Sequence, residues 1–162
     1  MPNVVAVSLS DIKVAVGEGD VLVAYSLGSC VGVALWDPVT KFGGMAHVVL
    51  PSSNGYSVDV AVPGKYADTA VPCLVERLRA AGCQMPRFKV WIAGGAHVLK
   101  SIKWPTGEIG AANVKAVLEA IGRLGLPAPA MDVGEDYGRT MRLYVSLGKV
   151  TVASVGRAER DM

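Results

Sequence analysis

The chain has 162 residues, of which 51% are apolar, so it is long enough for one domain with a sizeable core, and disorder is not expected. Lys and Arg number 16 against 14 Asp and Glu, and the formal charge of +2 does not by itself predict a nucleic-acid or membrane-surface partner. The longest uncharged stretches, 21–36 and 42–58, are interrupted by Gly, Ser, Asn or Pro and are shorter than the ~20 apolar residues that cross a bilayer, which excludes membrane insertion.

Short apolar runs rich in Val predict a series of β-strands in the first third of the chain. These runs are separated by Gly, Asp or Pro and span residues 4–9, 12–16, 21–25, 31–36 and 45–50. The following segment, 52–64, is rich in turn residues and predicts an irregular connection.

Two helices are predicted after residue 64. Lys65 to Ala81 carries an apolar stripe that stops at Gly82, and Pro72 predicts either a kink or a later start. The second helix spans 111–124. The remaining segments predict strands, namely 88–93 before Gly94-Gly95, and a hairpin of 140–147 and 150–155 through Gly148-Lys149. Many strands and two helices favour a single α+β domain over residues 1–162 rather than a regular βαβ repeat.

Three cysteines without a Cys-x-x-Cys pair indicate free thiols in a reducing compartment. The N-terminal segment lacks the basic region of a signal peptide, so we expect a cytoplasmic protein. The two histidines and the scattered cysteines have no zinc-ligand spacing, and no metal site is expected. Cys73, at the edge of the first helix stripe, and Cys83, after that helix, are interpreted as structural residues.

Cys30 and His47 belong to neighbouring apolar runs that read as a β-hairpin with a turn starting at Asp37. A four-residue loop, Asp37 to Thr40, sets Cys30 directly opposite His47 on one sheet face. A five-residue loop instead turns the two side chains to opposite faces. The pattern therefore permits a thiol–imidazole contact without establishing it.

A thiol beside an imidazole is sufficient for nucleophilic catalysis, because the base activates the sulfur. Gly28 allows an unusual backbone conformation before Cys30, and N–H groups of Gly28 and Ser29 could form an oxyanion hole. The alternative is that both side chains are ordinary core residues, as buried Cys and lone His in apolar strands usually are.

The motifs LGSCVGVALWDP and GGMAHVVLP resemble the chemoreceptor glutamine deamidase (CheD) family, in which LGSC and AH carry the catalytic Cys and His. KYADTAV, IAGGAHVL, IGAANV and DVGEDYGRTMRLYVSLGKVTV extend the resemblance to nearly the whole chain. It implies a sheet-rich, sandwich-like core of mixed or antiparallel strands with helices packed outside. It also identifies Cys30 and His47 as the catalytic pair.

Three positions depart from the family pattern. The family often has a Thr five or six residues before the Cys, where this chain has Ala24 and Tyr25. Either Ser26, the nearest hydroxyl, or a backbone carbonyl would then orient His47. The chain also has Ala111 in place of the usual Arg, and Gly134-Glu135 in place of paired glycines.

The resemblance implies cysteine-dependent hydrolysis of a glutamine carboxamide on chemotaxis receptors, giving glutamate and ammonia without a cofactor. It also implies a CheC-type phosphatase as a protein partner. Two other hypotheses stay open. One is a regulatory binding module with weak or lost activity, suggested by the missing Thr. The other is a related thiol amidase, such as a transglutaminase or peptidase.

Two groups of polar residues lie outside the Cys30–His47 motifs. His97, after Gly94-Gly95, is expected to be exposed or locally hydrogen-bonded, with a supporting role at the site as the alternative. Arg139 and Arg142 lie near several acidic residues and are expected to form a solvated charge cluster, with a partner-docking surface as the alternative.

Overall fold

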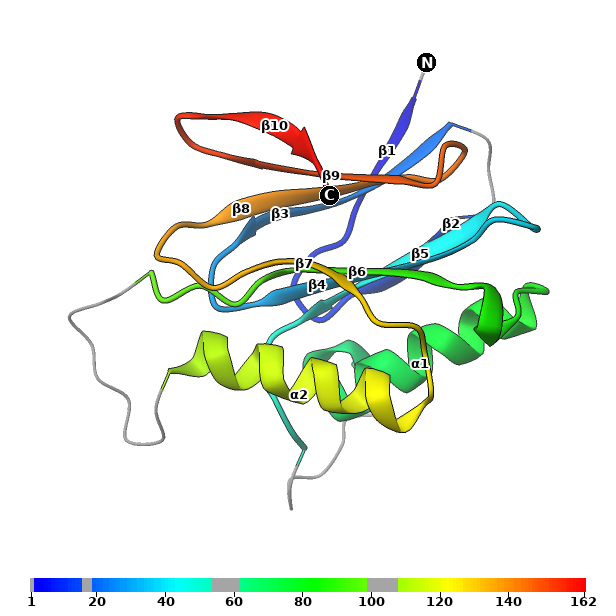
Figure 1. Cartoon of the computed structure of the whole chain (residues 1–162), viewed down its shortest axis with the longest axis horizontal. Helices are drawn as coiled ribbons and strands as arrows, with labels where there is room; N and C mark the ends of the chain where they lie inside the picture. The colour runs from blue at the N-terminus through cyan, green and yellow to red at the C-terminus, as the bar shows by residue number, and fades with distance from the viewer. Residues whose placement is uncertain (1, 16–18, 54–61, 99–107) are drawn as a thin grey trace.

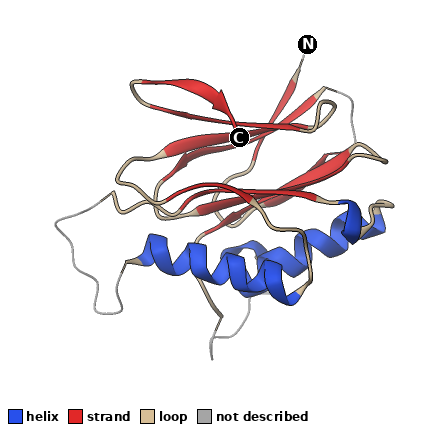
Figure 2. Ribbon diagram, viewed as in Figure 1, coloured by secondary structure: helices blue, strands red, loops and turns tan. Residues whose placement is uncertain are grey.

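Two five-stranded sheets lie face to face, and both α-helices cover the outer face of one of them (Figures 1 and 2). The computed structural model describes residues 2–15, 19–53, 62–98 and 108–162. This sheet-rich α+β arrangement, with helices outside a sandwich of sheets, confirms the predicted fold class.

The sheet that carries no helix, here called sheet A, is mixed. Its strands, in spatial order, are β1 (Asn3–Ala6), β3 (Asp20–Leu27), β8 (Arg139–Tyr144), β9 (Lys149–Ser154) and β10 (Arg157–Asp161). β1 runs parallel to β3 and every other pairing is antiparallel.

The second sheet, sheet B, lies between sheet A and the helices. Its strands, in spatial order, are β2 (Ile12–Ala15), β5 (Phe42–Val48), β4 (Val31–Asp37), β6 (Lys89–Gly94) and β7 (Ala130–Val133). Every residue of the central strand β4 is buried, because one face packs on sheet A and the other on the helices. This explains the uninterrupted apolar run of this strand.

The helices are α1 (Ala67–Ala80) and α2 (Ile109–Arg123). A short 3₁₀ turn, η1 (Pro63–Lys65), precedes α1, and a second, η2 (Met85–Arg87), precedes β6. α1 begins well before Pro72, so the alternative of a late start is wrong, and the proline lies inside the helix. None of the helices in the described ranges is long and apolar enough to cross a membrane.

β7 and β10 are edge strands that the sequence patterns did not predict. β10 reads RAERD and is exposed at all five positions, so it lacks the alternation that marks a half-buried strand. β7 has four residues, of which none is fully buried. Both form because a neighbouring strand offers unpaired backbone groups, which is information that their own side chains do not carry.

Candidate active site

Cys30 lies immediately before β4, and His47 lies on the adjacent strand β5. The observed register sets Gly32, rather than Cys30, directly opposite His47. Both registers considered from the sequence are therefore wrong. The loop does have four residues, but they are 38–41, so each β4 residue meets a partner two positions further along β5.

An offset of two residues preserves the face on which a side chain lies. Gly32 faces sheet A, since a Cβ added there would contact Met141 of β8, and directly opposed residues share a face. His47 therefore points into the space between the sheets. Cys30 packs against the same inter-sheet core, so the two side chains share one side of sheet B.

The displacement of the loop has its origin in Asp37, which is fully buried and remains in the strand opposite Phe42. Its carboxylate accepts hydrogen bonds from the Val39 N–H (2.8 Å) and from the Arg87 guanidinium. The Lys41 N–H closes the loop on the Asp37 carbonyl at 2.7 Å, with Lys41 at φ 59°. The turn thus begins after Asp37 rather than at it.

His47 is 4% exposed, and its Nδ1 lies 2.9 Å from the backbone carbonyl oxygen of Val7. A carbonyl can only accept a hydrogen bond, so Nδ1 carries the proton in the neutral ring and Nε2 carries the lone pair. Nε2 is buried, with no hydrogen-bond partner among the described residues. Burial lowers the pKa of His47, and the bond to Val7 and the charge of Asp11 oppose that shift.

Cys30 is half-buried, and burial raises the pKa of its thiol, while its own backbone N–H acts in the opposite direction. The raised thiol pKa and the lowered pKa of His47 both favour a neutral thiol and a neutral imidazole at neutral pH. This form differs from the thiolate–imidazolium ion pair that activates many cysteine nucleophiles.

The backbone around Cys30 is held by the segment that follows β6. The Gly95 N–H donates to the Cys30 carbonyl at 2.9 Å, and the Ala96 N–H donates to the Gly28 carbonyl at 2.8 Å. Gly94 and Gly95 have φ of 109° and 64°, a region that L side chains rarely adopt. A Cβ at Gly94 would also collide with the Cys30 carbonyl oxygen, so the approach needs glycine.

α2 packs closely against the segment that follows β6. It also supplies a further hydrogen bond to the backbone before Cys30. A Cβ at Gly110 would lie 2.5 Å from the Ala96 carbonyl oxygen, so glycine is needed for the close approach. One turn further, the side chain of Asn113 is fully buried, and its Nδ2 donates to the carbonyls of Ser29 (2.8 Å) and Val49 (3.0 Å).

Ser26 and Ala24 occupy different environments on β3. Ser26 lies at an irregular position of the strand with φ 54°, is exposed, and donates its backbone N–H to Thr140 Oγ1 at 3.3 Å. Ala24 is fully buried in the inter-sheet core, close to Gly32. The hydrogen-bond partner of His47 Nδ1 is Val7, and no hydrogen bond between Ser26 and His47 is found among the described residues.

A cavity of about 530 Å³ opens beside the Cys30 loop, with Gly28 and Ser29 in its wall. The rest of the lining is mainly apolar and includes Val49, Val98 and Ile109. A mainly apolar pocket with few polar groups is typical of ligand sites. It therefore offers space for a substrate next to Gly28 and Ser29, the residues that precede Cys30.

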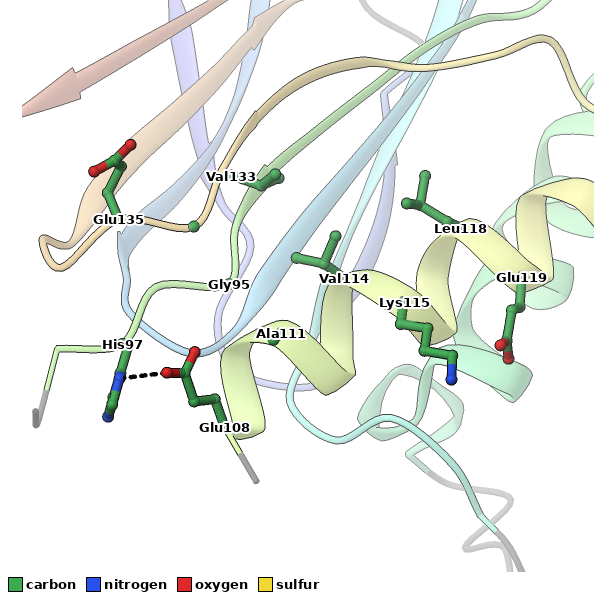
Figure 3. A pocket seen from close by; sticks show the side chains of 11 residues that line it. Gly95, His97, Glu108, Ala111, Val114, Lys115, Leu118, Glu119, Val133 and Glu135 are labelled. Atoms are coloured by element: carbon green, nitrogen blue, oxygen red, sulfur yellow. Dashed lines mark ion pairs between the residues drawn. The ribbon is translucent and has the colours of Figure 1, made fainter. Parts of the chain in front are cut away.

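His97 lines this cavity and also a neighbouring groove of about 580 Å³ between α2 and the end of β7. Its Nδ1 lies 2.9 Å from Glu108 Oε1 (Figure 3), which agrees with the expected local hydrogen bonding. Within the described ranges, no group of three or more acidic, His or Cys side chains is arranged to hold a metal ion.

Comparison with known proteins identifies the family. Residues 49–154 match the model of the family described as "CheD chemotactic sensory transduction". The chain belongs to the CheD family. A CheD relative from Symbiobacterium thermophilum is 46% identical over 97% of this chain and 96% of its own length. Relatives from Desulfitobacterium hafniense (36%, 99% of each chain) and Geobacter sulfurreducens (37%, 100% of each chain) also align over their full length.

The names of these relatives are "Probable chemoreceptor glutamine deamidase CheD" and, for the last, the same name with the number 3. The family match starts two residues after His47, so it covers Asn113 and the Gly94-Gly95 segment of this CheD chain but not the Cys–His pair. The full-length alignments include the pair.

Two contributors to the site were not assigned a role from the sequence. The Val7 carbonyl has no sequence signature, because every residue has a carbonyl. Asn113 does have one, since it is a polar residue that falls on the buried stripe of α2 with Val117 and Ala120. A buried amide on an apolar stripe indicates a specific hydrogen-bonding task.

Proposed function

We propose that this CheD chain is a chemoreceptor glutamine deamidase in which Cys30 is the nucleophile and His47 the base. The observation that carries the proposal is the unpartnered Nε2 of His47, which lies on the same side of sheet B as Cys30. The substrate class comes from the full-length relatives, whose names describe chemoreceptor glutamine deamidases.

In the acylation step, the Cys30 thiol proton passes to His47 Nε2 while the sulfur attacks the Cδ of a receptor glutamine. The resulting imidazolium protonates the amide nitrogen, the C–N bond breaks and ammonia leaves. The Val7 carbonyl supports this step, because it keeps the Nδ1 proton in place and stabilises the positive ring. The product of the step is a thioester between Cys30 and the glutamyl side chain.

In the deacylation step, His47 takes a proton from water, and the hydroxide formed attacks the thioester carbonyl. The C–S bond breaks, the sulfur recovers its proton from His47, and glutamate is released. Backbone N–H groups of Gly28 and Ser29 are the donors that we assign to the oxyanion. Their loop is preorganised, because the carbonyls of Gly28, Ser29 and Cys30 are all hydrogen-bonded.

The second candidate function is a binding module that has kept the fold with weak or lost activity. The observation that favours it is the absence of a hydroxyl at Ala24, which faces the inter-sheet core near Gly32. The Val7 carbonyl weighs against it, since it supplies an orienting acceptor for His47 without any side-chain hydroxyl.

The proposal includes a cytoplasmic location, where the signalling helices of chemoreceptors lie, and a single domain over residues 1–162. A CheC-type phosphatase is the partner that the family resemblance implies. The groove between α2 and β7 and the cavity beside the Cys30 loop are two concave surfaces near the site that could receive a helical protein substrate.

The test is incubation of a purified chemoreceptor cytoplasmic fragment with wild-type protein, Cys30→Ala and His47→Gln. We expect wild type to convert specific glutamines to glutamates, read by peptide mass spectrometry, and both variants to leave them unchanged. Binding of the fragment without any mass change would favour the binding module. Amine incorporation or chain cleavage would instead identify a transglutaminase or peptidase.

A further inference from the structure

Asn113 connects the two segments that carry the proposed catalytic residues. Ser29, whose carbonyl accepts one of its hydrogen bonds, directly precedes Cys30. Val49, whose carbonyl accepts the other, lies two residues after His47. A single carboxamide on α2 therefore bridges the nucleophile loop and the end of β5.

The chemistry of the bridge requires a neutral group with two donor hydrogens. The Nδ2 group of Asn has two, and both bonds are at ordinary distances of 2.8 and 3.0 Å. The Oδ1 atom is buried without a partner in the described part of the chain. An unpaired buried acceptor costs stability, so an amide at this position is not kept because all its polar atoms are hydrogen-bonded.

Beyond the end of the β4–β5 ladder, the other hydrogen bonds to the nucleophile loop among the described residues do not make this link. Gly95 and Ala96 hold the carbonyls of Cys30 and Gly28, but both belong to the segment after β6. Those bonds fix the loop relative to β6. The β4–β5 ladder pairs Val31 with Val48, and Asn113 extends this link past the ladder, to Ser29 before β4 and Val49 after β5. Asn113 acts on both segments at once.

We propose that Asn113 is a positioning residue that holds the Cys30 sulfur in register with His47 Nε2. This inference rests on the proposed Cys30–His47 chemistry. Asn113 is fully buried and is not part of the cavity wall, so it acts through the backbone and does not touch substrate. Its loss should lower kcat and the reactivity of Cys30 with little effect on KM.

The experiment compares Asn113→Leu, which keeps a similar volume without donors, and Asn113→Ser, whose hydroxyl can reach one carbonyl at a time. Val117→Ala is the matched control, because Val117 is buried one turn further along α2 and contacts the core rather than either loop. Alkylation of Cys30 by iodoacetamide is followed against pH by peptide mass spectrometry, which separates it from Cys73 and Cys83. His47→Gln gives the profile of Cys30 without its base.

For both Asn113 variants we expect Cys30 alkylation at neutral pH to fall toward the His47→Gln level, with a midpoint at higher pH. kcat should fall by roughly 10- to 100-fold, since a misplacement of about 1 Å can cost that much. Val117→Ala should keep the wild-type profile despite its lower melting temperature. A wild-type profile and kcat in either Asn113 variant, folded at the assay temperature, would overturn the proposal.

The two proposals fail in different ways. If the wild type deamidates no receptor glutamine but its alkylation profile still depends on His47 and Asn113, the receptor substrate is wrong and the positioning role stands. If His47→Gln leaves the alkylation profile unchanged, the Cys30–His47 pair itself is refuted and the positioning role with it.

Discussion

The imidazole of His47 donates a hydrogen bond from Nδ1 to the backbone carbonyl of Val7, at 2.9 Å. Val7 follows β1 of sheet A and His47 belongs to β5 of sheet B, so this bond joins the two sheets. Its effect is to fix one tautomer and to leave Nε2 as a lone pair in a buried position. Of the two orienting groups that the sequence left open, Ser26 and a backbone carbonyl, a carbonyl is the one within hydrogen-bond distance of the ring.

The buried position of His47 predicts how activity declines at acid pH, the acid limb of the pH–activity profile. The ring must be neutral to accept the thiol proton, and its pKa is lowered from 6.5 mainly by burial. Activity should therefore persist below pH 6.5 and decline only as the pH falls through the lowered value. The measurement is kcat/KM on the receptor fragment from about pH 4 to about pH 8, a range that brackets the ordinary His pKa.

Asp11 provides an internal check on this profile, because its negative charge raises the pKa of His47 against the effect of burial. Asp11→Asn keeps a side-chain oxygen that can accept the Ser8 N–H and removes the charge. The acid limb should move to still lower pH in this variant. A wild-type midpoint above 6.5, or an upward shift in Asp11→Asn, would contradict the assignment of the limb to His47.

Ser26 should be dispensable for catalysis, because it is exposed and the orienting acceptor of His47 is Val7. We expect Ser26→Ala to keep kcat within about twofold of wild type and its free energy of unfolding within about 0.5 kcal/mol, the usual limit for the stability effect of a surface change. Ser26→Gly is the control for the backbone, since glycine accepts φ 54° without strain. A large loss of kcat in both variants would return the orienting role to this hydroxyl.

The sequence indicated which side chains could carry the chemistry of the site, but not the register in which β4 and β5 pair. Cys30 and His47 stand out because each occurs in a short motif beside glycines, and their shared face survives the error in register. The error arose because the turn position depends on Asp37, whose partner Arg87 lies 50 residues away in the chain. No local pattern around residues 37–41 records that contact.

Arg139 shows the same limit for charged residues. A cluster of Arg and acidic residues in one segment usually forms a solvated surface, yet Arg139 is 2% exposed. Its guanidinium bonds the Asp132 carboxylate at 2.6 Å and the carbonyls of Asp132 and Gly134. It is buried because its hydrogen bonds join the start of β8 in sheet A to β7 in sheet B. This contact between the two sheets cannot be read from the local sequence.

Gly94 should be intolerant of a side chain. Alanine there would adopt φ 109° and would bring a Cβ into the Cys30 carbonyl oxygen, so the nucleophile loop must move. Gly125→Ala is the matched control, because Gly125 also has a positive φ, 70°, but nothing lies within 4 Å of its Cβ position. Both variants should lose about 1–2 kcal/mol of stability from backbone strain alone.

The two glycine variants should differ in activity. Gly94→Ala should lose more stability than Gly125→Ala in urea unfolding and should lower kcat by at least tenfold or so, because Cys30 is displaced. Gly125→Ala should retain wild-type kcat. Equal activity in the two variants would show that the contact between Gly94 and the Cys30 carbonyl does not matter for the reaction.

The ion pair of Asp37 and Arg87 should dominate the acid sensitivity of folding. Burial alone would raise the pKa of Asp37, but hydrogen bonds from Arg87, Gln84 and Val39 outweigh it, and the net pKa lies below 3.8. A carboxyl with a lowered folded pKa stabilises the fold above its unfolded value, and that contribution is lost as pH falls through the folded pKa. We therefore expect the free energy of unfolding to drop as the pH is taken below about 3.8.

Arg87→Met tests this directly, because it leaves the fully buried Asp37 carboxylate without its cation. At pH 7 the variant should lose about 3–5 kcal/mol of unfolding free energy, the usual cost of breaking a buried pair. The difference from wild type should shrink at acid pH, where Asp37 becomes neutral in both proteins. Arg79→Met, which breaks the exposed pair with Glu76, should be nearly neutral at every pH. A loss in Arg87→Met that did not change with pH would point to lost packing by the Arg87 side chain rather than to its charge.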